Sequence, residues 1–456
     1  MSATLTADII QKDKQSVWHH LLHHQQLEQA DPMVIVSGQG LTVTDINGKE
    51  YLDAVSGGVW TVNVGYGRQR IADAVAQQLV QLPFFSGSAG TIPGAEFANE
   101  LTKLVPYLDR VYYSSSGSEA NEKAYKMVRQ RAHALNGGKK HKIIYRDRDY
   151  HGTTIAALSS TGQLERKAQY GPYVDGFVEM PNCSSYRNPF PGEDPLRCAT
   201  ILEDIILREG PDTVGAVVLE PITAGGGVII PPDGYFQVIR EICDRYGVLL
   251  HIDEVVCGMG RTGRWFGHQH FDVKPDLLAM AKGVASGYAA ISVTMTTSEV
   301  FDVFNQSEDK TTGFFRDIST FGGCTAGPAA GLENLRIIQE ENLVENSRIV
   351  GDYLKDQLLG LQEKYHEIGD VRGMGLFAGI ELVNDRKTKE PCSEEIVNRI
   401  KGLCMKQGVM IGSSNRSMPG LNNTLLLSPP LICSNSDIDV IVEAMDQAMA
   451  QTFASA

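Results

Sequence analysis

The chain has 456 residues, a length that predicts roughly two or three packed units. Hydrophobic residues make up 42% and charged residues 21% of it, which excludes a disordered or fibrous protein. Its 41 Lys and Arg residues are outnumbered by 55 Asp and Glu residues, and the net charge of −14 disfavours nucleic acid and anionic membrane surfaces as partners.

No segment approaches the roughly 18 consecutive apolar residues that cross a bilayer, and the N-terminal sequence lacks the basic and apolar regions of a secretory signal. We therefore expect a cytoplasmic protein. The eight cysteines are scattered without a CxxC pair, so we expect reduced, mostly buried thiols and no metal site.

The first part of the chain predicts a small antiparallel unit. Residues 34–53 alternate around a turn at Asn47-Gly48, which is typical of a hairpin. We assign residues 1–65 to an N-terminal segment that contributes to a small domain.

The middle of the chain predicts a large α/β domain over residues 66–325. A helical pattern at 69–82 is followed by short, uniformly apolar runs, and further helical patterns occur at 203–210 and 233–247. Uniformly apolar runs of strand length are typical of parallel strands buried on both faces of a sheet. These runs are residues 141–145, 215–220, 247–253 and 277–281.

The last part of the chain, residues 326–456, predicts a long connecting helix and a small α+β unit. One helical pattern covers residues 330–365, and strand patterns at 375–383 and 424–431 alternate with helical patterns at 394–408 and 437–451. We expect the small sheet to accept the N-terminal strands. The predicted fold is therefore α/β, with a large, mostly parallel sheet and a small α+β domain made from both termini.

Two residues at strand ends suggest the chemistry, because ligands of open α/β sheets bind beyond the carboxyl ends of the strands. Asp253 ends the strand at 247–253, and a buried carboxylate is costly unless a cation meets it. A helix N-cap or an ordinary salt bridge would also explain it. Lys282 follows the strand at 277–281, where desolvation would make its amine a nucleophile, although a solvated lysine is the simpler alternative.

Together the two residues fit the needs of pyridoxal phosphate, which requires an imine-forming lysine and an acid that keeps its ring nitrogen protonated. Ser116, Gly117 and Ser118 stand before a helical pattern and could bind the phosphate, or they could form a plain serine-rich N-cap. Tyr150 and His151 follow the strand at 141–145 and could stack on the cofactor ring.

Five motifs and Lys282 resemble the signature set of the class III aminotransferases, which belong to the fold-type I pyridoxal-phosphate enzymes. The similarity runs from about residue 30 to the C-terminus. A GxGRTG string can also indicate a nucleotide loop, but here it follows the strand that ends in Asp253 instead of opening a βαβ unit. The motifs are SSGSEAN at 115–121, DYHGTT at 149–154, LEP at 219–221, DEVVCGMGRTG at 253–263 and KPD at 274–276.

The resemblance implies a role for each matching residue in holding the cofactor. Lys282 would hold it covalently and move the proton of the substrate carbon, while Asp253 would pair with the ring nitrogen. The other implied contacts are Gly117 and Ser118 to the phosphate, Tyr150 and Val255 to the two ring faces, and Glu220 near the cofactor oxygen and the substrate gate. Thr320 matches a residue that reaches the phosphate of the neighbouring subunit, which implies a homodimer with shared active sites.

The pocket residues resemble those of one branch of the class III aminotransferases, which transfers the amino groups of ω-amino acids and other amines to pyruvate. Within that branch the similarity is to the members that use taurine. Trp60 matches the aromatic wall of the substrate pocket; Phe84 and Phe85 could extend that wall or pack in the core. Arg416 resembles an arginine that grips the acid group of the substrate, and a surface arginine is its alternative.

The resemblance therefore implies ping-pong transfer of the terminal amine of taurine, or of a related ω-amino acid, to pyruvate, giving an aldehyde and L-alanine. A β-alanine, ω-amino-acid or amine:pyruvate aminotransferase shares nearly all of these residues. Two further alternatives keep the fold: an aminomutase or racemase, which needs no second substrate, and a non-catalytic protein, which should have lost Lys282 or Asp253.

Overall fold

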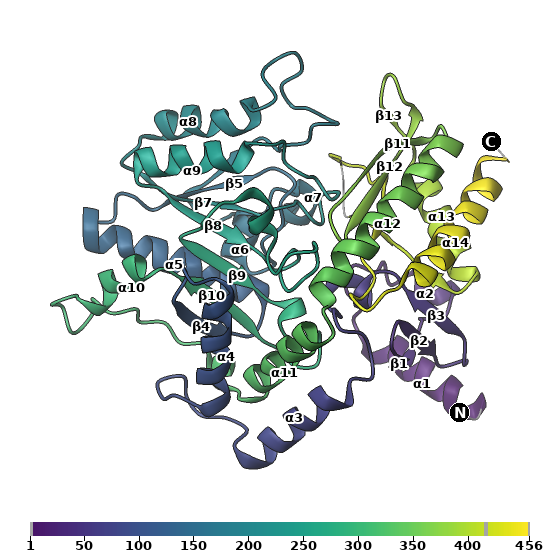
Figure 1. Ribbon diagram of the computed structural model, residues 1–456, viewed down its shortest axis with the longest axis horizontal. Helices are drawn as coiled ribbons and strands as arrows, with labels where there is room; N and C mark the ends of the chain where they lie inside the picture. Colours follow the sequence, from purple (N-terminus) through teal and green to yellow (C-terminus); the bar gives the residue numbers. More distant parts are fainter. Residues whose placement is uncertain (1–2, 415–417, 455–456) are drawn as a thin grey trace.

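The computed structural model describes residues 3–414 and 418–454. Its centre is a seven-stranded sheet with the strand order β4-β10-β9-β8-β7-β5-β6 (Figure 1). Strands β9, β8, β7, β5 and β6 run parallel to one another, whereas β10 pairs antiparallel with both β9 and β4. The strands are β4 Arg110–Ser114, β5 Lys142–Arg146, β6 Phe177–Met180, β7 Val214–Leu219, β8 Leu249–Asp253, β9 Leu277–Met280 and β10 Ser292–Thr296.

Helices cover both faces of the sheet, which explains why its central strands are apolar on both sides. Val217 and Leu219 of β7 pack in one core with helices α8 and α9, while Ala216 and Val218 of the same strand pack in another core with α5. Figure 1 shows α8 and α9 on one side of the strands and α5 on the other. The helices are α5 Gly117–Asn136, α8 Arg197–Glu209 and α9 Tyr235–Tyr246.

Three strands of the large sheet, β4, β6 and β10, were not predicted because they lack a continuous apolar run. Strand β10 alternates small hydroxyl residues with Val and Met, yet all five of its residues are buried. Its hydroxyls are satisfied inside the protein: Ser292 Oγ lies 2.8 Å from Ser114 Oγ, and Thr294 Oγ1 donates to the Ala120 carbonyl at 2.8 Å. Hydrogen bonding therefore allows a polar sequence to form a buried strand between two others in this sheet.

Segments from both ends of the chain form the smaller part of the molecule. The sheet β1-β2-β3-β14 joins three N-terminal strands to β14, which runs parallel to β3, and a second sheet has the order β11-β12-β16-β15. The predicted domain boundaries, after residues 65 and 325, stay predictions. The strands are β1 Ile35–Gln39, β2 Thr42–Asp45, β3 Glu50–Asp53, β11 Ile368–Gly373, β12 Ala378–Asp385, β13 Glu390–Pro391, β14 Val409–Met410, β15 Gly412–Ser413 and β16 Thr424–Leu427.

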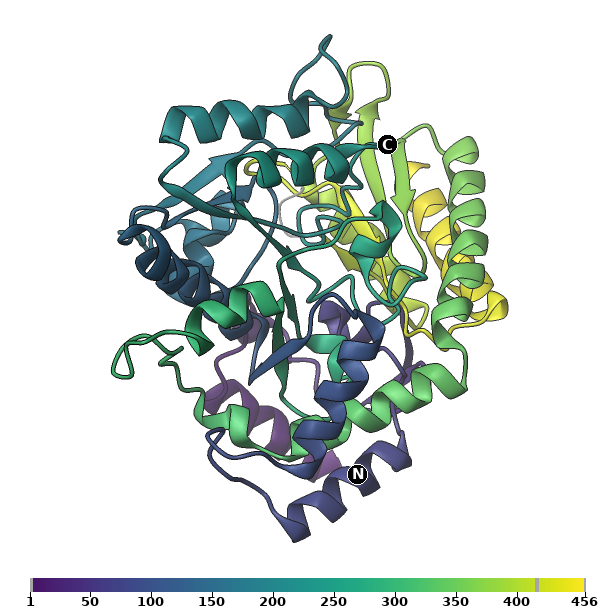
Figure 2. The ribbon, with the colours of Figure 1, turned by 60° about the vertical axis from the view of Figure 1, so that its left-hand side comes forward.

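The predicted single connecting helix is wrong, because the segment forms two helices. Helix α11, Ala326–Glu340, ends just before α12, Leu343–Lys364, and Asn342 between them has a left-handed backbone with φ 52°. Asparagine tolerates this conformation better than most residues, so the helix can end there. The apolar periodicity of the sequence nevertheless continues through this point. Figure 2 shows α12 on the outer side of the small sheet beside α14, Asn435–Phe453.

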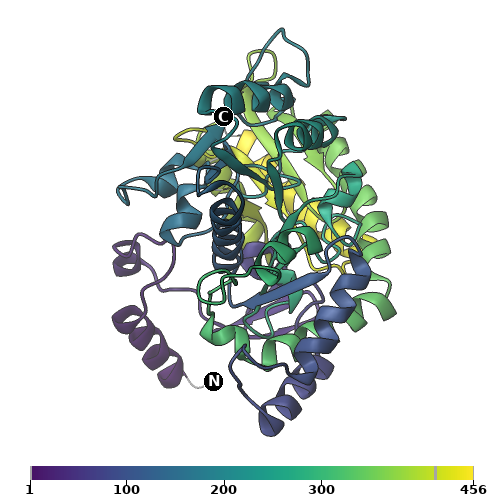
Figure 3. The ribbon, with the colours of Figure 1, turned by 90° about the vertical axis from the view of Figure 1, so that its left-hand side faces the viewer.

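The remaining helices lie mainly at the periphery, and Figure 3 shows the first of them standing out from the body. Within the described part of the chain, no helix combines the length and apolar character that a membrane crossing needs. Seven of the eight cysteines are buried, as predicted, and Cys324 is half-buried. These helices are α1 Ala3–Ser16, α2 Gln26–Gln29, α3 Gln69–Gln81, α4 Ile92–Leu104, α6 Ile155–Ser159, α7 Leu164–Lys167, α10 Ser298–Asn305 and α13 Glu394–Lys406.

Arg261, in the GxGRTG string, holds the two chain ends against the large sheet. Its side chain is completely buried, and burial lowers its pKa to about 10 although the charge of Asp53 opposes the shift. One terminal nitrogen donates to two backbone carbonyls of the C-terminal part, and the other donates to Ser56 Oγ at 3.0 Å and Asn63 Oδ1 at 2.8 Å. The string therefore has a structural role in this protein.

We predict that Arg261→Lys lowers the free energy of unfolding by about 2–5 kcal/mol, because one ammonium cannot reach four separated acceptors and leaves buried oxygens unsatisfied. Denaturant unfolding of the holoenzyme measures this loss. The matched control is Arg348→Lys on the exposed face of α12, which should barely change stability. Equal effects of the two substitutions would contradict the structural role of Arg261.

Candidate active site

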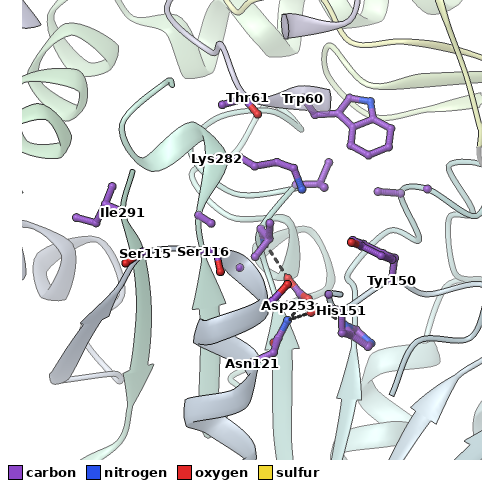
Figure 4. A pocket seen from close by; sticks show the side chains of 18 of the residues that line it. Trp60, Thr61, Ser115, Ser116, Asn121, Tyr150, His151, Asp253, Lys282 and Ile291 are labelled. Carbon is purple, nitrogen blue, oxygen red and sulfur yellow. Dashed lines mark hydrogen bonds and ion pairs between the residues drawn. The ribbon is translucent and has the colours of Figure 1, made fainter. Parts of the chain in front are cut away.

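A cavity of about 410 Å³ lies beyond the carboxyl ends of the central strands (Figure 4). The structure brings ten of the predicted site residues to its wall, from segments far apart in the sequence. Asp253 ends β8, Lys282 follows β9, and Ser116–Ser118 surround the start of α5. The ten residues are Trp60, Ser116, Gly117, Ser118, Tyr150, His151, Glu220, Asp253, Val255 and Lys282.

Asp253 is a buried carboxylate that hydrogen bonds keep ionised. Burial alone would raise its pKa, but hydrogen bonds lower it below the ordinary value. Oδ2 accepts from His151 Nδ1 and from Asn121 Nδ2, each at 2.8 Å, and Oδ1 accepts from the Val255 amide at 3.0 Å. Figure 4 shows Asn121, His151 and Asp253 grouped at the floor of the cavity. The acid is therefore charged and fixed in direction.

A second layer beneath Asp253 was missed by the sequence reasoning. Asn121 belongs to the SSGSEAN motif, and its amide nitrogen also donates to the His151 carbonyl at 2.8 Å. His251 Nε2 lies 2.7 Å from Asn121 Oδ1 and must donate the proton, because that oxygen can only accept. Burial lowers the pKa of His251 to about 4, so it is neutral at pH 7. His251 thereby fixes the orientation of the Asn121 amide toward Asp253.

Lys282 supplies an amine that can exist in the neutral form. Burial lowers the pKa of this side chain, although the negative charges of Asp253 and Glu220 oppose the shift. Its Nζ lies 5.8 Å from the centre of the Trp60 ring, and its backbone has a left-handed φ of 44°. A lysine held in a strained conformation inside a cavity fits a catalytic role better than an ordinary solvated one.

The start of α5 forms a cradle that fits an anion. Ser116 caps this 20-residue helix by accepting from the Glu119 amide at 3.3 Å, and the buried Ser115 Oγ has no hydrogen-bond partner. A Cβ atom at Gly117 would lie 3.0 Å from the Val255 side chain, so glycine allows the close packing there. Free backbone amides and the helix dipole both favour a phosphate at this end.

Glu220 and Tyr150 form another part of the cavity wall. The Glu220 carboxylate accepts from the Tyr150 amide at 2.8 Å and from the Ala224 amide at 3.0 Å. Burial and the neighbouring charges of Asp149 and Asp253 nevertheless raise its pKa well above the usual range. The pKa of Glu220 therefore moves in the direction opposite to that of Asp253.

Two predicted residues, Thr320 and Phe85, lie elsewhere. Thr320 is exposed and Phe85 is 52% exposed, and neither lines the cavity within this single chain. Phe84 is also 43% exposed, so neither phenylalanine is a core residue. Arg416 lies outside the described residues.

The comparisons with known proteins agree with this geometry. The class III aminotransferase family matches residues 25–449. The chain is 58% identical to a hypotaurine/taurine–pyruvate aminotransferase of Paracoccus denitrificans, covering 98% of this chain and 97% of the relative. It is 56% identical to a taurine–pyruvate aminotransferase of Rhodobacter capsulatus, covering 97% of each chain.

Solved structures give the same result. A Bacillus anthracis aminotransferase is similar with a TM-score of 0.95 and 38% identity, covering 99% of this chain and 100% of that one. An omega transaminase of Pseudomonas jessenii in complex with PMP has a TM-score of 0.93 and 32% identity, with 98% of each chain covered. This chain belongs to the class III aminotransferases. The predicted fold class and the predicted cofactor, pyridoxal phosphate, are confirmed.

The described side chains fit that cofactor. The unpartnered Ser115 Oγ and the start of α5 provide for a phosphate, while Asp253 provides the fixed negative charge that a protonated ring nitrogen requires. Lys282, with its lowered pKa, provides the amine for covalent attachment. The individual roles assigned to these residues stay predictions.

We predict that Asp253→Asn preserves the fold but lowers turnover at least ~100-fold, because a neutral amide cannot hold the ring nitrogen protonated. Circular dichroism and turnover with pyruvate measure the two effects, and the pH dependence of the cofactor absorbance should change with the substitution. Turnover within a few-fold of the wild-type value would contradict the role of Asp253.

Proposed function

We propose that this aminotransferase transfers the terminal amine of taurine, or of a closely related ω-amino acid, to pyruvate. The products are the aldehyde of the donor and L-alanine. The observation that carries the proposal is the common cavity of Lys282, the charged Asp253 and the aromatic wall at Trp60. Identities of 56–58% over nearly the whole chain to enzymes named for taurine and pyruvate support the choice of substrates.

The side chains of the cavity divide the reaction between them. Pyridoxal phosphate, when bound, supplies a carbonyl that takes up amines and a ring that withdraws electrons. Lys282 Nζ removes the proton from the carbon that bears the amine, and the lowered pKa of this lysine favours the neutral base. Asp253 holds the proton on the ring nitrogen, while Trp60 and Tyr150 limit the space beside the reacting carbon.

Both half-reactions use this cavity. The donor leaves its amine and departs as the aldehyde, and pyruvate then enters the same space and leaves as alanine. Arg416, which the sequence resemblance assigns to the acid group of the substrate, completes the proposed site. An aminomutase or racemase would need no keto acid acceptor.

A panel of amino donors tests the proposal. We predict that taurine with pyruvate gives stoichiometric alanine and aldehyde, with kcat/KM higher for pyruvate than for 2-oxoglutarate. Lys282→Ala should lower this rate by several orders of magnitude, and borohydride followed by peptide mapping should label Lys282 in the wild type only. A cofactor label on another lysine would contradict the role of Lys282, and alanine formation independent of any donor would contradict the proposed reaction.

We also propose a homodimer in which Thr320 and Phe85 reach the active site of the partner subunit. The Phe85 amide donates to the Gly323 carbonyl at 3.2 Å, which joins these two segments in one region of the surface. Large exposed apolar side chains in these segments and in the neighbouring helices support a protein contact there. They are Val80, Phe84, Phe85, Ile92, Ile318 and Phe321.

We predict that Thr320→Ala weakens cofactor retention, whereas the neighbouring control Ser319→Ala does not. Mixed dimers decide which chain supplies the threonine. A dimer of one Thr320→Ala chain and one Lys282→Ala chain should regain one complete site, with cofactor affinity like that of the wild type. If its working site retained cofactor as poorly as the Thr320→Ala homodimer, Thr320 would act within its own chain.

A further inference from the structure

Arg166 is a positively charged side chain beside the cavity that the chemistry described above does not use. It lies in α7, and its guanidinium carbon is 4.6 Å from the centre of the Tyr150 ring. Its Nε donates to Gln163 Oε1 at 2.8 Å, and the buried Gln163 in turn donates to the Arg148 carbonyl at 3.1 Å. The stacked ring and this hydrogen bond hold the guanidinium in place.

No carboxylate neutralises Arg166 within the described part of the chain. The adjacent Glu165 faces other partners, because its Oε2 lies 4.0 Å from Arg148 Nη1 and its Oε1 accepts from the Gly420 amide at 2.6 Å. Burial lowers the pKa of Arg166, and only Tyr150 opposes that shift. A half-buried cation without an acidic partner is costly to the folded protein, which favours an anionic ligand for it.

Arg166 does not itself line the active-site cavity but lies against Tyr150, which does. The charge of Arg166 contributes to the lowered pKa of Lys282. Arg166 also lines a neighbouring hollow of about 430 Å³, whose exposed rim includes Leu21 and Tyr170. Arg166 thus lies between the wall of the active-site cavity and the neighbouring hollow.

We propose that Arg166 binds the sulfonate of the amino donor. Stacking on Tyr150 uses the face of the guanidinium and leaves its N–H edge available, and that edge matches two oxygens of a sulfonate or carboxylate. This assignment rests on the proposed function and deepens it, because it names the group that selects an acidic donor.

The two substrates carry their acid groups at different places. The carboxylate of pyruvate is attached to the reacting carbon itself, whereas the sulfonate of taurine is one carbon farther away. Arg166 adjoins the cavity through the Tyr150 ring and therefore suits the more distant group. Helix α7 is also tied to the segment that follows β15, because the Gly420 amide donates to Glu165 Oε1 at 2.6 Å.

Binding of ethanesulfonate, which has the sulfonate but no amine, tests the site directly. Arg166→Met keeps the apolar stem but removes the charge, and it should weaken calorimetric binding of ethanesulfonate to the holoenzyme about 10- to 100-fold. Arg166→Lys should recover part of the affinity. The matched control Lys167→Met removes a cation from the same helix, whose amine instead contacts Tyr145 and Ser159, and it should leave the affinity unchanged.

Single-turnover bleaching of the cofactor absorbance separates recognition from chemistry. In Arg166→Met we expect the apparent second-order rate constant of bleaching to fall about 10- to 100-fold with taurine but less than about 3-fold with propylamine. The return of the absorbance when pyruvate is added to the aminated enzyme should also slow less than about 3-fold. Equal losses for taurine and propylamine, or unchanged ethanesulfonate binding, would overturn the proposal. If wild-type enzyme bound ethanesulfonate through Arg166 but did not turn over taurine, the anion site would stand and the proposed donor would fall.

Discussion

The structure depends on keeping one carboxylate, Asp253, charged inside the protein. A buried acid normally becomes neutral, because desolvation penalises its charged form. Here three donors offset that cost, and each of them comes from a different segment of the chain. Asn121 brings the start of α5 toward the sheet, His151 brings the segment after β5, and Val255 closes the turn after β8. Holding the charge therefore also assembles the walls of the cavity.

Glu220 shows that burial alone does not set the state of an acid in this cavity. Both Glu220 and Asp253 are buried, yet their pKa values move in opposite directions. Asp253 receives hydrogen bonds from two side chains, whereas Glu220 receives only backbone amides and lies near two other carboxylates. The hydrogen bonds that each carboxylate receives, and the charges near it, therefore decide the direction in which its pKa moves.

The sequence predicts the parts of this protein that rest on continuous apolar runs or on a local motif. Strands β5, β7, β8 and β9 follow from such runs, and the ten cavity residues follow from their place after predicted strands or before a helix, or from the resemblance to the class III aminotransferases. Strand β10 escapes prediction because its hydroxyls find partners only in the folded sheet, and the break at Asn342 escapes because the apolar period continues through it.

The supporting layer of the site escapes prediction for the same reason. His251 lies two residues before Asp253 and therefore on the same side of β8, but its partner, Asn121, is 130 residues away in sequence. Arg166 carries no signal at all in the local sequence, where a lysine follows it and a glutamate precedes it. Its significance comes from a contact with Tyr150 and from the lack of an acidic partner among the described residues, and both are properties of the fold.

Arg261 connects the packing of the two chain ends against the large sheet with the shape of the active site. Arg261 donates to Ser56, which lies in the same turn as Trp60. Asp53 fixes that turn from the other side by accepting from the amides of Val55 and Gly57. Trp60 consequently holds a strained backbone, with φ 61°, and reaches the cavity from the N-terminal segment. The segment that begins with Asp253 thus also positions, through Arg261, the aromatic wall opposite it.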